Sequence, residues 1–107
     1  MKKIYYGKAV YDKKEIKAVV NVLTKNSLTL VDGQNVKKLE KKVSRLFGKK
    51  YGLMVNSGSS ANLLAIASFN FKKGSEIITP NLTFSTTVAP IYQLGLKPNF
   101  IGVEKNK

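Results

Sequence analysis

Residues 55–64 read V-N-S-G-S-S-A-N-L-L, and they join a strand-like run to a helix-like run through a Gly/Ser turn. The run before the turn, residues 51–55 (Y-G-L-M-V), is short and apolar and lies between turn-forming residues, which is typical of a buried strand. Leucine and alanine then recur at helical spacing over residues 60–67, and Ser59 or Ser60 is a good N-cap for that helix. The stretch therefore predicts a strand, a tight turn and a helix.

A turn of this kind binds anions when the first amides of the helix stay open. Unpaired N–H groups and the positive end of the helix dipole attract phosphate. Gly58 lets the backbone approach a ligand closely, because glycine has no Cβ and tolerates positive φ. We therefore expect the amides of residues 58–61 to face a phosphate-sized site, although an ordinary capped turn of an α/β protein would have the same sequence.

Three familiar motifs do not fit this turn. The P-loop requires a Gly-Lys-Ser/Thr end, but no lysine lies between Asn56 and Asn70, and the Rossmann fingerprint needs three spaced glycines where this turn has one. The nucleophile elbow G-x-S-x-G fails because Asn62 occupies the position of its last glycine. The chain also has no histidine to act as a general base, which argues against a serine hydrolase.

Composition narrows the classes further. The 107 residues, 43% of them hydrophobic, suffice for one compact domain or for a piece of a larger one. Without cysteine or histidine, and with only six scattered carboxylates, the chain is not expected to bind a metal. The start M-K-K-I-Y-Y-G lacks a long apolar stretch, and no run approaches the roughly 20 residues that cross a bilayer, so we predict a cytoplasmic protein without a membrane partner.

The net charge of +13 invites a nucleic-acid interpretation, since 14 of the 19 basic residues lie in the first 50 positions. However, 18 of the 19 are lysine and only Arg45 is arginine, whereas bidentate recognition of phosphates and bases favours arginine. Lysine pairs such as Lys37-Lys38 and Lys41-Lys42 also lie opposite the apolar positions of a helical segment, where solvated lysine is usual. A basic nucleic-acid-binding module is therefore kept only as an alternative.

Two amphipathic helices are predicted before the Gly/Ser turn. The first covers residues 12–24, where Asp12 and Glu15 form a capping box. The second covers residues 35–47 and ends at Gly48, because glycine readily adopts the left-handed conformation that closes a helix.

Two further strands are predicted after the turn, at residues 76–79 and 97–103. The helix between them covers residues 85–94, ends at Gly95 and contains Pro90 in its early part, where proline is least costly. The order is αα followed by βαβαβ. It predicts an α/β fold with right-handed crossovers and a mostly parallel sheet flanked by helices.

A sheet that stops at its third parallel strand would leave an exposed apolar edge, because parallel sheets are normally covered on both faces. The chain is therefore expected to be an incomplete part of a larger protein. We expect two divisions: an N-terminal helix and loop segment over residues 1–34, and part of a large domain over residues 35–107.

The second chemically informative stretch is residues 80–87 (P-N-L-T-F-S-T-T), at the carboxyl end of the strand predicted at residues 76–79. Ligands of open α/β sheets bind at this edge. Phe84 could stack there on a planar ligand whose phosphate lies at the Gly/Ser turn. The alternative is that Phe84 packs the start of the following helix against the core.

In this order and spacing, both elements resemble the DegT/DnrJ/StrS family of pyridoxal-phosphate-dependent nucleotide-sugar aminotransferases. The resemblance implies part of the large domain of a fold-type I transferase, in which Ser59 and Ser60 hold the phosphate of pyridoxal 5'-phosphate and Phe84 stacks on its pyridine ring. Gly102 stands where the family usually has aspartate in the final strand, outside the cofactor contacts. The similarity covers nearly the whole chain, through N-S-L-T-L-V-D-G-Q-N-V-K-K-L-E, V-N-S-G-S-S-A-N-L-L, K-K-G-S-E-I-I-T-P-N-L-T-F-S-T-T and L-G-L-K-P-N-F-I-G-V-E.

The resemblance also implies what such an enzyme has elsewhere. Its Schiff-base lysine and the acidic partner of the pyridine nitrogen come after the last residue of this chain, so no catalytic residue is assigned here. The chain would be about a quarter of the enzyme and inactive alone. The complete enzyme is expected to be a homodimer that transfers an amino group, with glutamate as the expected donor, to a nucleotide-linked keto sugar in cell-surface polysaccharide or amino-sugar biosynthesis. The alternative is a deoxysugar 3-dehydratase of the same superfamily, which has histidine in place of that lysine.

Overall fold

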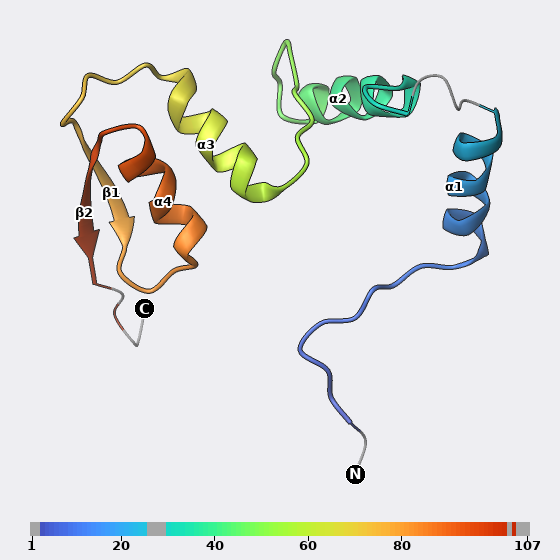
Figure 1. Ribbon diagram of the computed structural model, residues 1–107, viewed down its shortest axis with the longest axis horizontal. Coiled ribbons are helices and arrows are strands. Elements are labelled where there is room, and N and C mark those ends of the chain that lie inside the picture. The colour runs from blue at the N-terminus through green and yellow to red at the C-terminus, as the bar shows by residue number, and fades with distance from the viewer. Residues whose placement is uncertain (1–2, 26–29, 103, 105–107) are drawn as a thin grey trace. The chain divides into compact units, whose positions relative to one another are not determined.

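The computed structural model describes residues 3–25, 30–102 and 104. They belong to two compact units, Met1–Met54 and Val55–Lys107. None of the helices in the described ranges has the length and apolar character that a membrane span requires. In chain order (Figure 1), the elements are α1 (Lys13–Lys25), α2 (Gln34–Leu46), α3 (Gly58–Ser68), β1 (Glu76–Pro80), α4 (Ser85–Gln93) and β2 (Lys97–Ile101).

The first unit contains α1 and α2, which lie within about one residue of their predicted bounds. The capping box at the start of α1 is confirmed: Asp12 Oδ1 accepts from the Lys14 amide at 2.6 Å. Glu15 Oε2 in turn accepts from the Asp12 amide at 2.8 Å. Gly48 follows α2 with a φ of 62°, so the predicted glycine at that helix end is confirmed as well.

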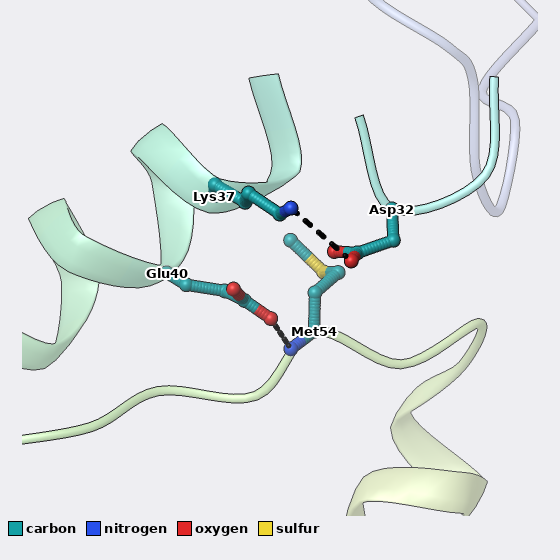
Figure 2. A network of polar contacts seen from close by, with 4 residues as sticks. All are labelled: Asp32, Lys37, Glu40 and Met54. Atoms are coloured by element: carbon teal, nitrogen blue, oxygen red, sulfur yellow. Dashed lines mark hydrogen bonds and ion pairs between the residues drawn. The ribbon is translucent and has the colours of Figure 1, made fainter. Parts of the chain in front are cut away.

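Residues 51–55 are not a strand in the structure, and this part of the prediction is wrong. The amide of Met54 donates to Glu40 Oε1 of α2 at 2.8 Å and not to a neighbouring strand, as Figure 2 shows. Gly52 lies so close to α2 that a Cβ there would come within 2.8 Å of the carbonyl oxygen of Glu40. The first unit therefore holds this apolar run against a helix.

Figure 2 also shows an ion pair beside this contact, between Lys37 of α2 and Asp32 of the preceding loop. The Lys37 Nζ lies 3.6 Å from Asp32 Oδ2, and the two side chains are 55% and 66% exposed. An exposed pair of this kind contributes at most about 1 kcal/mol to stability. The packing of Gly52 and the Glu40 contact therefore define this part of the unit more than the ion pair does.

The second unit contains a βαβ element, which confirms the predicted α/β class with parallel pairing. β1 and β2 pair in parallel, with Glu76 opposite Lys97. The crossover helix α4 covers the sheet with Ile91, which is 1% exposed, and Leu96 follows it at 5%. The described sheet has two strands where three were predicted, because residues 51–55 do not join it.

The two faces of β1 differ in burial, as the alternation of side chains along a strand requires. Thr79 is 3% exposed, whereas Ile78 is 69% exposed. Since α4 contacts both strands, it accounts for the buried face. The sheet thus has one covered face, and its carboxyl end leads through residues 81–84 directly into α4.

Candidate functional site

The Gly/Ser turn forms the start of α3, but the helix begins earlier than predicted. Its N-cap is Ser57 and not Ser59 or Ser60: the Ser57 hydroxyl accepts from the Ser60 amide at 3.2 Å. The Ser57 carbonyl accepts from the Ala61 amide at 3.1 Å, which is the first regular bond of the helix. The physical reason is reach, since an N-cap side chain bonds the amide three residues later.

This earlier start changes which amides are open. The expectation that all four amides of residues 58–61 are open is wrong for Ser60 and Ala61, because both donate to Ser57. Within the described part of the chain, the amides of Gly58 and Ser59 have no hydrogen-bond partner. Two open donors and the positive end of the helix dipole therefore remain at this turn.

The two serines named by the sequence differ in their contacts. The Ser60 hydroxyl donates to Asn56 Oδ1 at 2.7 Å. It also accepts from the Ser57 hydroxyl at 3.1 Å. Among the described residues the Ser59 hydroxyl has no partner, so it is the serine that can donate to a ligand without losing an internal contact.

Gly58 is not required by the backbone conformation. Its φ is not positive, so the tolerance of glycine for that conformation is not used here, and a Cβ built on Gly58 meets no atom within 4 Å. Glycine inside a helix is up to about 1 kcal/mol less favourable than alanine. Because Gly58 has no side chain, the space beside the open amides of Gly58 and Ser59 stays uncovered.

Phe84 is the N-cap residue of α4, with φ −72° and ψ 142°, and its side chain makes no capping bond. It is 75% exposed, so the alternative that it packs the helix start against the core does not hold in the described structure. An exposed aromatic ring is available to stack on a ligand.

Pro90 leaves the carbonyl of Thr86, four residues earlier in α4, without its usual helical donor. It is the sixth residue of α4 and so lies later than predicted, at a position where a helical N–H would normally donate to the carbonyl of Thr86. The side-chain amide of Asn62 from α3 donates to that carbonyl instead, at 3.5 Å. This contact joins the second turn of α3 to the first turn of α4.

Between the two helices lies a cleft of about 210 Å³. Ser59 and Ser60 line it from the first turn of α3, and Thr86 lines it from the first turn of α4. Since α4 starts just after the carboxyl end of β1 (Figure 1), the Thr86 end of this cleft lies near that end of the strand. Phe84 does not line the cleft but precedes Thr86 by two residues. The other lining residues are Leu63, Ala89, Pro90 and Gln93.

Residues 10–107 match the DegT/DnrJ/EryC1/StrS aminotransferase family. This chain belongs to that family. It is 40% identical to a GDP-4-keto-6-deoxy-D-mannose 3-dehydratase of Yersinia pseudotuberculosis over 91% of the chain and 26% of the relative. It is 32% identical to a UDP-4-amino-4,6-dideoxy-N-acetyl-beta-L-altrosamine transaminase of Helicobacter pylori over 99% of the chain and 28% of the relative.

Solved structures of the family have the same fold. The structure of Escherichia coli GDP-4-keto-6-deoxy-D-mannose-3-dehydratase with bound hydrated PLP matches with a TM-score of 0.80 and 40% identity, over 91% of this chain and 26% of that one. The chain thus spans about a quarter of the length of these relatives. The predicted family and fold class are confirmed.

Three residues at this site were not predicted: Ser57, Asn56 and Asn62. The role of Ser57 could have been predicted from its position, because an N-cap serine accepts from the amide three residues later and Ser57 stands three residues before Ser60. The role of Asn62 is harder to predict. Pro90 indicates that the Thr86 carbonyl lacks its helical donor, but no pattern in the sequence shows which side chain supplies another.

We expect the Asn62 contact to stabilise the second unit only because residue 90 is proline. Replacing a helical asparagine with alanine gains helix propensity, so the matched control is Asn21→Ala in α1. Relative to the natural chain, Asn62→Ala should lower the free energy of unfolding by about 1 kcal/mol more than the control does, as measured by urea titration. In a Pro90→Ala background, where residue 90 regains its N–H, this difference should disappear. An equal effect of Asn62→Ala in both backgrounds would contradict the assignment.

Proposed function

We propose that the chain carries the phosphate-binding part of the cofactor site of a PLP-dependent sugar aminotransferase. One observation supports this most strongly: three free donors, the amides of Gly58 and Ser59 and the hydroxyl of Ser59, are grouped at the start of α3. Donors of this type and a helix N-terminus are suited to a phosphate. No carboxylate lines the adjoining cleft, so the lining adds no negative charge against an anion.

We propose that Ser59 and Phe84 contact the cofactor directly and that Ser60, the other serine of the pair, supports the same turn through its bond to Asn56. Ser59 would bind the phosphate, with Ser60 in the same turn, and the exposed ring of Phe84 would stack on the pyridine. When bound, PLP supplies an electron sink that stabilises a carbanion. The residues of this chain hold and orient the cofactor, while the lysine that binds it covalently is not among those matched here. The proposal keeps residues 35–107 as part of the cofactor-binding domain and residues 1–34 as an N-terminal segment.

For the complete enzyme, we propose transfer of an amino group from an amino acid, with glutamate as the donor, to a nucleotide-linked keto sugar in polysaccharide or amino-sugar biosynthesis. The 32% identity to the Helicobacter pylori transaminase over 99% of the chain supports this reaction. A cytoplasmic location, a homodimeric assembly and the absence of nucleic-acid and membrane partners belong to the same proposal.

A 3-dehydratase is the second candidate, because the identity to the Yersinia pseudotuberculosis dehydratase is 40%. The two candidates differ at the position of the Schiff-base lysine: an aminotransferase binds the cofactor covalently through that lysine, whereas such a dehydratase has histidine there, which forms no Schiff base. Both require the same phosphate contacts, so the proposed roles of Ser59, Ser60 and Phe84 are common to them.

Gly58→Ala tests the phosphate site. Alanine should raise the free energy of unfolding by up to about 1 kcal/mol, but its Cβ occupies the space beside the open amides. Affinity for pyridoxamine 5'-phosphate, which cannot form imines with surface lysines, should fall at least about tenfold in calorimetric titration, equivalent to roughly 1.4 kcal/mol. Affinity for pyridoxamine, without the phosphate, should not change.

Gly7→Ala is the matched control, since a Cβ at Gly7 also meets nothing within 4 Å and the residue lies in the other unit. It should leave the affinity for pyridoxamine 5'-phosphate unchanged. If Gly58→Ala binds as tightly as the natural chain does, the phosphate is held elsewhere and the proposed site is wrong.

The chain as written should show no turnover with PLP, glutamate and a nucleotide-linked keto sugar. Covalent catalysis needs an activated amine held at the reacting carbon, and none of the lysines here is matched to that role. Product formation is measured by mass spectrometry, with Phe84→Ala in parallel. Turnover that Phe84→Ala abolishes would show that a lysine of this chain is catalytic.

A further inference from the structure

The hydrogen bonds around the Gly/Ser turn separate its two ligand-facing serines. We propose that Asn56 is a positioning residue that commits the Ser60 hydroxyl to the protein, so that Ser59 is the serine that donates to the phosphate. This inference rests on the proposed cofactor site and assigns its contacts to particular groups. Asn56, Ser57 and Ser60 are called the Asn56 cluster below.

Both hydroxyl protons of the Asn56 cluster are in use, and the Ser57 hydroxyl also lies 3.5 Å from Asn56 Oδ1 as a second acceptor. The Ser60 hydroxyl donates to Asn56 Oδ1 at 2.7 Å, the shortest bond of the cluster, and the Ser60 amide donates to the Ser57 hydroxyl at 3.2 Å. The Ser57 hydroxyl donates its own proton to Ser60 Oγ at 3.1 Å. Asn56 Oδ1 is the last acceptor of this chain of bonds, since a carbonyl oxygen has no proton to pass on.

A phosphate at this turn therefore meets two unlike serines. Ser60 would present oxygen lone pairs, which repel an anion, unless its proton left Asn56. Ser59 has an uncommitted hydroxyl beside an uncommitted amide, and it can donate both without breaking an internal bond. Hydrogen bonds to charged acceptors are stronger than neutral ones, so the free hydroxyl should contribute most of the serine-dependent affinity.

The decisive experiment measures how each serine affects the dissociation constant of pyridoxamine 5'-phosphate. Ser59→Ala should weaken binding about tenfold, whereas Ser60→Ala should change it less than about threefold. In an Asn56→Ala background the Ser60 proton is released. There, Ser60→Ala should weaken binding about tenfold, an effect that a purely structural role of Asn56 would not produce.

Ser68→Ala is the matched control, because Ser68 lies at the other end of α3 and its hydroxyl donates to the Ala65 carbonyl at 2.7 Å. It should not change the affinity. Equal losses for Ser59→Ala and Ser60→Ala in the natural background would overturn the inference while leaving the proposed cofactor site standing. No binding by the natural chain would overturn the cofactor site and, with it, the assigned role of Ser59.

The link between Asn56 and Ser60 is also tested without any ligand. In urea unfolding, Asn56→Ala and Ser60→Ala should each lower the unfolding free energy, and the double variant should lose clearly less than the sum of the two, because both remove the same bond. Additive losses would overturn the role of Asn56, whatever the ligand measurements show.

Discussion

Pro90 has no N–H group, and this leaves the carbonyl oxygen of Thr86 without the donor that a regular helix would supply. Asn62 takes that place from α3, at 3.5 Å. This contact joins α3 to the first turn of α4, and the cleft that Ser59 and Ser60 line lies between the two helices. The crossover helix α4 packs on the sheet and α3 packs against α4, so the Asn62 contact joins two helices that also pack against each other.

The features of this site are not those that stability alone would favour. Gly58 is a glycine within a helix, where alanine would fit without a clash. The amides of Gly58 and Ser59 stay unpaired in the described structure, and Phe84 keeps 75% of its surface exposed. A capped amide, an alanine and a buried aromatic would each stabilise the isolated unit more. A bound phosphate would use the open amides and the space at Gly58, which supports the proposed site. The exposure of Phe84 does not by itself indicate a ligand, because other apolar side chains of the described residues, such as Leu82 at 82%, are exposed as well.

Local patterns predicted most of the helices and strands because their causes are local. The capping box of Asp12 and Glu15 depends on spacing within a few residues, and β1 and β2 are joined by a single crossover helix. The run at residues 51–55 was wrongly predicted as a strand because pairing depends on a distant partner, and here a carboxylate of α2 takes the amide. Ser57 and Asn62 were missed for related reasons: several serines compete for one cap, and a carbonyl freed by proline does not determine its new donor. The cofactor roles of Ser59, Ser60 and Phe84 came from a family resemblance. The family match confirms the family, and the roles of these residues stay proposals.

The central claim, that the start of α3 binds the cofactor phosphate, is tested most directly by nuclear magnetic resonance. The ¹⁵N-labelled chain is titrated with pyridoxamine 5'-phosphate and, separately, with pyridoxamine. The account predicts that the largest phosphate-dependent shifts occur at the amides of Gly58 and Ser59, accompanied by changes in the ring signals of Phe84. Phosphate-dependent shifts concentrated on the lysine-rich α2, with the Gly58 and Ser59 amides unchanged, would contradict it.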